Sequence, residues 1–183
     1  VGAKSHPLGV SLADKSKGAG GGAKGATATD LVVVDEKPGK DKAARQVVLG
    51  WPGTLPAPVL DGTRATYTDA SPGVDVVVET RRSGFEQLTV IRDEAALDAL
   101  VAAAGGGDVS WSLPVRTKGL SARAEKDGSV SFVDAKGVVV SRFATPIAWD
   151  GKVDERSGEK VNASPVGVSV AQISLLVNTQ IAS

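Results

Sequence analysis

The sequence predicts an all-β protein, namely a β-sandwich-like domain of roughly ten strands in two sheets with one short helix. Three observations lead to this prediction. Apolar residues repeatedly alternate with polar ones, and a period of two is the signature of a half-buried strand. Turn-forming residues separate these runs. A single segment, which begins at Asp93, has the apolar spacing of an α-helix instead.

The first thirty residues differ in composition from the rest of the chain. Residues 1–30 are rich in glycine, alanine and lysine, so we expect a flexible N-terminal segment, with one strand at 8–12 as an open alternative. The glycines at 20, 22 and 25 match the spacing of a dinucleotide fingerprint, but that motif needs a strand before it and a helix after it. We therefore interpret this stretch as a linker, and assign residues 31–183 to the β-sandwich-like domain.

Two short apolar runs open the main domain. Residues 31–35 and 46–49 are rich in β-branched side chains and flank a charged turn, which is typical of hairpin arms. The following segment, 50–58, contains three prolines and cannot continue a central ladder. We expect it to cross from one sheet to the other along the surface.

The clearest pattern is a β-hairpin over 65–91. Alternate valines from Val74 to Val78 point to one face of its first strand, and a second alternation runs from Phe85 to Ile91. The polar turn between them, 81–84, ends in a glycine, which can adopt a positive φ. We expect this hairpin to form the centre of the fold.

The segments after the hairpin fit a helix and a meander. Asp93 is a predicted N-cap, an apolar stripe follows it, and the glycines at 105–107 end the helix. Residues 109–113 resemble a strand, and 115–143 resemble a β-meander in which Asp-Gly marks a turn. The final strands are predicted within 166–177, paired inside the polypeptide. The predicted core residues are Val74, Val76, Val78, Phe85, Leu97, Leu100, Trp111, Phe132 and Phe143.

Composition excludes several classes of site. Lysine plus arginine and aspartate plus glutamate both number 21, so no broad positive field attracts nucleic acid. No apolar run approaches the roughly 18 residues of a membrane helix. Without cysteine there are no disulfides or thiolate metal sites, and the one histidine, His6, lies far in sequence from any triad partner. We expect no catalytic residue, no metal and no cofactor. The missing initial methionine favours removal of a leader and a secreted or cell-surface location.

Three tryptophans are the candidate ligand contacts. Aromatic rings stack on sugars, so Trp51, Trp111 and Trp149 are candidate glycan contacts. For Trp51 the preferred interpretation is a plug at one end of the core.

Carboxylates on the central hairpin are candidates for hydrolysis. Asp75 and Glu79 are separated by roughly 13 Å along one strand, farther than the ~5 to 9.5 Å between paired glycosidase carboxylates. A carboxylate on a neighbouring strand is the remaining way to build such a pair. We prefer ion pairing with nearby arginines. The carboxylates are Asp69, Asp75, Glu79 and Glu86, and the arginines are Arg81, Arg82 and Arg92.

The string YTDASPGVDVV at 67–77 resembles a block found in the N-terminal β-rich regions of large secreted bacterial proteins. These are wall-associated and Rhs/YD-repeat proteins, and actinobacterial surface proteins with LamG-like or DNRLRE-type modules. Four further strings fit the same resemblance, and the five strings together contain 65 of the 183 residues. They lie at 50–62, 83–93, 113–137 and 146–150.

The resemblance implies a non-catalytic structural or presentation module of a larger secreted or cell-surface protein, including a polymorphic toxin-delivery protein of the Rhs or wall-associated type. A carbohydrate- or cell-wall-binding module is the alternative, and a carboxylate-dependent hydrolase is a third possibility. The implied partners are other domains of the same polypeptide and, in the alternative, cell-wall glycan, without nucleic acid or a membrane span. The chain contains no YD repeats, so toxin delivery itself is not assigned to these residues.

Overall fold

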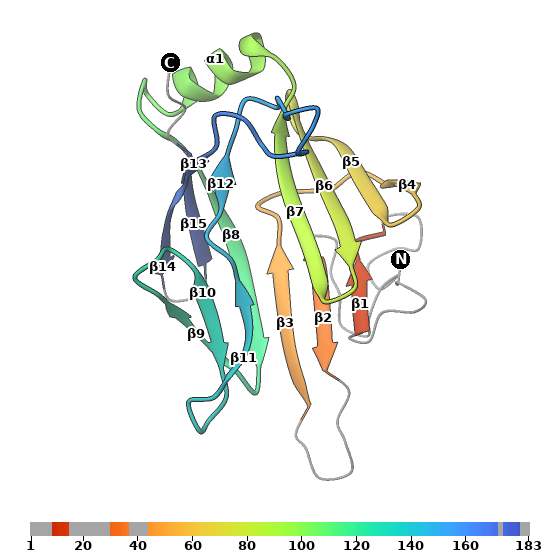
Figure 1. Ribbon diagram of the computed structural model, residues 1–183, viewed down its shortest axis with the longest axis vertical. Helices are drawn as coiled ribbons and strands as arrows, with labels where there is room; N and C mark the ends of the chain where they lie inside the picture. The colour runs from red at the N-terminus through yellow and green to blue at the C-terminus, as the bar shows by residue number, and fades with distance from the viewer. Residues whose placement is uncertain (1–8, 15–29, 37–43, 172–173, 180–183) are drawn as a thin grey trace.

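The computed structural model describes residues 9–14, 30–36, 44–171 and 174–179 (Figure 1). In this part of the chain the secondary structure is strands and a single α-helix, which confirms the predicted all-β class. Fifteen strands are assigned within the described residues, more than the roughly ten expected, because strands of only two or three residues also form, namely β4 (Val59–Asp61), β12 (Ile147–Ala148) and β13 (Ser164–Pro165). All their pairings are antiparallel.

A six-stranded sheet contains both the first and the last described strands. β2 (Asp30–Glu36) and β3 (Arg45–Gly50) form the predicted hairpin. β8 (Val109–Lys118) joins this hairpin to the C-terminal strands, because it pairs with β3 and with β15 (Ser174–Thr179). The final strands are thus paired within the chain, as expected. The order across the sheet is β1 (Gly9–Leu12), β2 (Asp30–Glu36), β3 (Arg45–Gly50), β8 (Val109–Lys118), β15 (Ser174–Thr179) and β14 (Gly167–Ala171).

The predicted central hairpin lies in a four-stranded sheet. Its two strands pair through a tight turn, and the valines at the predicted inward positions of β6 are completely buried. The predicted crossover at 50–58 connects β3 to this sheet, which confirms that it changes sheets. The strands in order are β4 (Val59–Asp61), β5 (Arg64–Ser71), β6 (Val74–Arg81) and β7 (Gly84–Ile91).

Two smaller sheets complete the fold. The predicted meander is confirmed as a three-stranded sheet with β10 in the middle. Its strands are β9 (Ser121–Ala124), β10 (Val130–Val133) and β11 (Val139–Phe143), and a separate pair is formed by β12 (Ile147–Ala148) and β13 (Ser164–Pro165).

One continuous core connects the six-, four- and three-stranded sheets. At the junction of the three- and four-stranded sheets, Phe143 makes edge-on ring contacts with Phe132 and Phe85, and the ring centroids are 4.9 and 5.9 Å apart. Four predicted core residues are buried, namely Val74, Val76, Val78 and Phe132. Four more pack against the core while partly exposed, namely Phe85, Leu100, Trp111 and Phe143. Leu97 is also partly exposed, because the helix α1 (Glu94–Ala103), to which it belongs, buries no residue fully.

The helix α1 (Glu94–Ala103) begins and ends where the sequence predicts. The Asp93 carboxylate accepts a hydrogen bond from the Ala96 amide (2.8 Å), which satisfies one of the free N–H groups of the first turn. Gly105 and Gly106 have positive φ values immediately after the helix. Figure 1 shows α1 lying across the end of the sheets.

Part of the N-terminal prediction lies outside the described residues. The strand left open at 8–12 is present as β1, which pairs with β2. The glycine-rich stretch and His6 are not among the described residues, so the flexible N-terminal segment and the solvated histidine stay predictions.

Candidate functional site

The string at 67–77 forms the junction of several elements. Tyr67 is completely buried, and its hydroxyl donates a hydrogen bond to the Ala13 carbonyl (2.8 Å), which ties the end of β1 to the four-stranded sheet. Burial, with a smaller contribution from the Asp14 carboxylate, raises the pKa of Tyr67. The phenol therefore stays neutral and keeps its donor proton at physiological pH.

A bulge follows Tyr67. The pairing of β5 with β6 shifts register between Tyr67 and Ser71, and Asp69 takes a φ of 56° there. The Asp69 amide donates a hydrogen bond to the Asp75 carboxylate (2.8 Å). Asp69 tolerates this left-handed conformation better than most residues, because its short polar side chain is suited to it.

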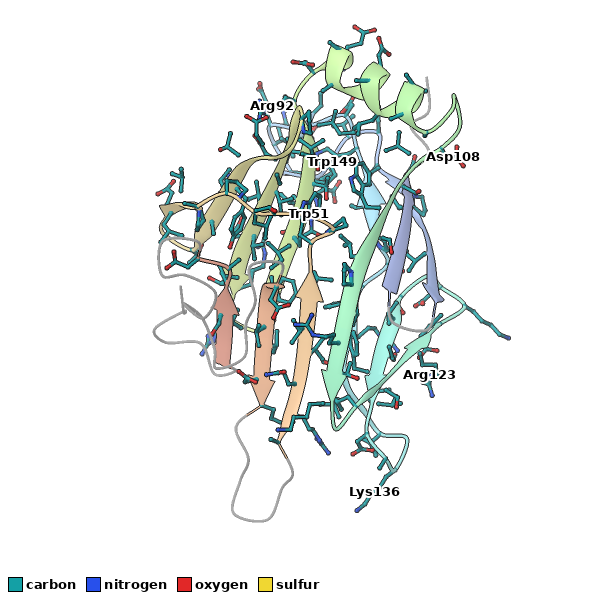
Figure 2. The ribbon with its side chains drawn as sticks, turned by 180° about the vertical axis from the view of Figure 1, so that it is seen from behind. Trp51, Arg92, Asp108, Arg123, Lys136 and Trp149 are labelled. Atoms are coloured by element: carbon teal, nitrogen blue, oxygen red, sulfur yellow. The ribbon has the colours of Figure 1, made fainter. Side chains whose placement is uncertain are left out.

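Arg92 closes the bulge from the end of β7 (Figure 2). Its Nε and Nη2 donate to the same Asp75 oxygen (3.1 and 2.8 Å), and its guanidinium also contacts the Asp69 carboxylate. The hydrogen bond from Arg92 is the main reason that the pKa of Asp75 lies below its ordinary value, and the Asp69 amide adds to the effect. Asp75 is therefore held as an anion that positions the bulge.

The glycine at position 73 of the string is required by the structure. Gly73 has a φ of 71°, and a Cβ atom placed on it would lie 2.4 Å from the Cβ of Ala96 in α1. The Gly73 carbonyl also accepts a hydrogen bond from the Arg92 amide (3.1 Å). A side chain at this position is excluded by both the backbone conformation and the helix.

A row of charges crosses the four-stranded sheet. The strand register places Arg64, Glu79 and Glu86 opposite one another on β5, β6 and β7. Glu79 accepts from Arg64 (3.3 Å) and pairs with Arg81 (3.7 Å), and Glu86 pairs with Arg81 (2.5 Å) and Lys160 (3.1 Å). The predicted ion pairing of the hairpin carboxylates is thus confirmed for Arg81 and Arg92. Arg82 is exposed in the turn and pairs with no carboxylate of the described residues.

These carboxylates are suited to act as anions. Partial burial alone would raise the pKa of Glu86, but hydrogen bonds from Arg81 and Lys160 outweigh it, and the pKa lies below its ordinary value. A carboxyl that serves as a general acid needs a raised pKa instead. Within the described residues, no three or more His, Cys, Asp or Glu side chains gather in a group able to hold a metal ion.

The three candidate tryptophans lie in different environments. Trp51 is 1% exposed, and its indole N–H donates to the Ala70 carbonyl (3.3 Å), so it plugs the core as expected and presents no ring face to a sugar. Trp111 packs partly exposed against the core. Trp149 is partly exposed, and the Lys160 ammonium lies 4.0 Å from the centre of its ring. A glycan contact stays a prediction for Trp111 and Trp149.

The described residues include no helix that is long and apolar enough to span a membrane.

Comparison with known proteins gives a partial match to one kind of protein. No protein-family model matches the chain, and no solved structure does. Over 99 residues the chain is 31% identical to the tRNA3(Ser)-specific nuclease WapA of Bacillus spizizenii. Over the same length it is 28% identical to the tRNA nuclease WapA of Bacillus subtilis and to the tRNA(Glu)-specific nuclease WapA of Bacillus subtilis subsp. natto. The aligned part is 54% of this chain and 4% of each relative, so the chain spans only a small part of their length.

These matches correct one expectation. The missing cysteine and the isolated histidine led to the prediction that the chain is not an enzyme, but the three relatives are named as tRNA nucleases. The sequence argument considered only thiols and a Ser-His-Asp triad, and the phosphodiester cleavage for which the relatives are named needs neither. What the matches do support is a similarity, over 54% of this chain, to part of three proteins named as tRNA nucleases.

Proposed function

We propose that this chain is a β-rich segment of a large secreted toxin polypeptide of the WapA type. In this proposal the parent polypeptide acts on tRNA, and the present segment is a folded platform against which other parts of the same polypeptide pack. The observation that carries the proposal is the match to three tRNA nucleases over 54% of this chain. The resemblance of the string at 67–77 to wall-associated and Rhs/YD-repeat proteins leads to the same kind of parent.

The role of a platform is supported by the way the string at 67–77 is used. Tyr67 and Gly73 contact elements far from them in the sequence, and Asp75 pairs with Arg92 at the end of the neighbouring strand. Such contacts fix the relative positions of β1, the four-stranded sheet and α1. A segment whose recurring residues hold its own elements together is suited to present a defined surface to a larger protein.

The proposal is tested with the parent polypeptide. Cleavage of purified tRNA is measured with the intact polypeptide, with the polypeptide lacking residues 1–183, and with the isolated chain. We expect the intact polypeptide to cleave tRNA, and the deletion to lower the yield of folded, protease-resistant protein. A Trp149→Ala variant of the parent serves as a control, because its ring is partly exposed and outside the string at 67–77.

Two results would contradict the proposal. One is an intact parent that leaves tRNA unchanged under conditions in which a WapA nuclease cleaves it. The other is a deletion variant as stable and as protease-resistant as the intact polypeptide, because a platform that packs against its neighbours must stabilise them.

A further inference from the structure

A second polar cluster, outside the sites described above, lies on the three-stranded sheet. The register of its strands places Ser131 of β10 directly opposite Arg123 of β9 and Arg142 of β11. Directly opposed residues of antiparallel strands project from the same face, so these three side chains share one face of the sheet. Phe132, the next residue, belongs to the core on the other face.

Ser131 is unusual among the described residues. It is 0% exposed, and its hydroxyl oxygen is the one buried side-chain N or O atom of that part of the chain without a hydrogen bond of standard geometry. Leaving a buried polar group without a hydrogen-bond partner is unfavourable. In the strand register the Ser131 hydroxyl lies between two arginines, and the Glu125 carboxylate is its nearby acceptor although the pair lacks the geometry of a standard hydrogen bond.

Glu125 lies beside these donors. Nε and Nη2 of Arg123 donate to one oxygen of its carboxylate (3.0 and 2.8 Å). The nearby Ser131 hydroxyl and then Arg123 hold the pKa of Glu125 below its ordinary value, and the charge of Arg142 adds to this effect. The Glu125 carboxylate thus interacts with Ser131, Arg123 and Arg142. Figure 2 shows Arg123 at the surface.

Two other charged side chains near Ser131 are Asp127 and Arg142. The Asp127 carboxylate accepts hydrogen bonds from the amide and the hydroxyl of Ser129 (3.0 and 2.6 Å), so it serves the turn, although it also lies within the field of Arg142. Arg142 is exposed and forms no ion pair with a described residue. The guanidinium of Arg142 is therefore available to an external anion.

We propose that Arg123, Ser131 and Arg142 form a binding site for a phosphate group, and that Glu125 acts as an internal anion that holds the site when no phosphate is bound. A phosphate has more acceptor oxygens and more charge than a carboxylate, and arginine matches its geometry with paired donors. Solvent-exposed ion pairs contribute little to stability, so an incoming phosphate displaces Glu125 at small cost.

The site is tested by titrating the folded chain with inorganic phosphate at constant ionic strength, while the backbone amide signals are followed by NMR. We expect saturable shifts at Ser131 and its neighbours. Arg142→Gln is expected to weaken phosphate binding about tenfold or more, because a charge-assisted hydrogen bond contributes about 1.5 to 3 kcal/mol. Glu125→Gln is expected to strengthen it by about two- to fivefold, because the competing ion pair is lost.

Arg82→Gln is the matched control, since Arg82 is an exposed arginine in a turn of another sheet. It removes the same charge and should leave phosphate affinity unchanged. Equal effects of Arg82→Gln and Arg142→Gln, or weaker binding by Glu125→Gln, would overturn the proposal. Thermal unfolding of each variant shows that it is folded.

A second titration separates the possible sources of the phosphate. A short single-stranded RNA that competes with inorganic phosphate at Ser131, and whose binding is weakened by Arg142→Gln, would support a nucleic-acid phosphate. An RNA that does not compete, while inorganic phosphate still binds, would support a free phosphate ion. If neither ligand binds, the proposed phosphate site is wrong, and this result does not depend on whether the proposed function is correct.

Discussion

At the scale of single residues, the string at 67–77 is explained by packing and backbone geometry. Tyr67 donates to the Ala13 carbonyl, Gly73 allows α1 to approach, and Asp75 is held by Arg92. The sequence predicted that the hairpin carboxylates pair with arginines, because arginines lie near them in the chain. It did not predict the bulge at Asp69 or the close approach of Ala96, because both depend on elements that are separate in the sequence.

The first prediction concerns Gly73 and a matched glycine. Gly73 and Gly105 both have a φ of 71°, but only a Cβ at Gly73 meets another atom within 4 Å. Gly105→Ala should therefore cost about 1 kcal/mol through backbone strain alone, and Gly73→Ala clearly more, because strain and the contact with Ala96 add. Urea unfolding of both variants measures the difference. Equal losses would mean that α1 moves away freely.

The second prediction concerns pH. The pKa of Asp75 is lowered from 3.8 in the folded state, so its contribution to stability is present above the unfolded pKa and is lost as pH falls through the folded pKa. Asp75→Asn should lower the free energy of unfolding at pH 7. Between about pH 5 and 2, that free energy should fall less in the variant than in the wild type. Denaturant unfolding across this range checks the sign. The control is Asp98→Asn, at an exposed helix residue. Parallel curves for the wild type and Asp75→Asn would contradict the assignment.

At the scale of elements, alternation and turn residues predicted most strands. The hairpin β6–β7, the meander β9–β11 and the capped helix lie where the sequence placed them, because each is a local pattern. The pairing of β8 with both β3 and β15 was not predictable, since it joins segments far apart in the chain. The same holds for Asp30, a buried carboxylate paired with Arg116 of β8, because one strand alone gives no sign of its partner.

The third prediction tests the meander. Phe132 is 1% exposed and packs edge-on against Phe143, so Phe132→Ala should cost about 3 to 5 kcal/mol in the free energy of unfolding. Val138→Ala, at a residue 57% exposed beside the same sheet, should change it by no more than about 0.5 kcal/mol. Chemical denaturation measures both. A small effect at Phe132 would show that β10 does not contribute this residue to the core.

At the scale of the whole molecule, one core connects three sheets, and function could be predicted only in part. Composition and motifs indicated the absence of familiar catalytic groups, but the relatives are nucleases, and the link to them comes from similarity rather than from chemistry visible in the chain. The cluster around Ser131 was equally hidden, because its residues are brought together only by the register of β9, β10 and β11.

The platform role is tested most directly by the affinity between this chain and the remainder of its parent polypeptide, produced separately. Isothermal titration calorimetry should detect a one-to-one complex with a Kd of about 1 μM or tighter, since domains that pack stably bury interfaces of this strength. Gly73→Ala should weaken the complex only in proportion to the fraction of the chain that it unfolds. Two folded partners that give no heat of binding and elute separately at concentrations of about 100 μM would contradict the proposed role.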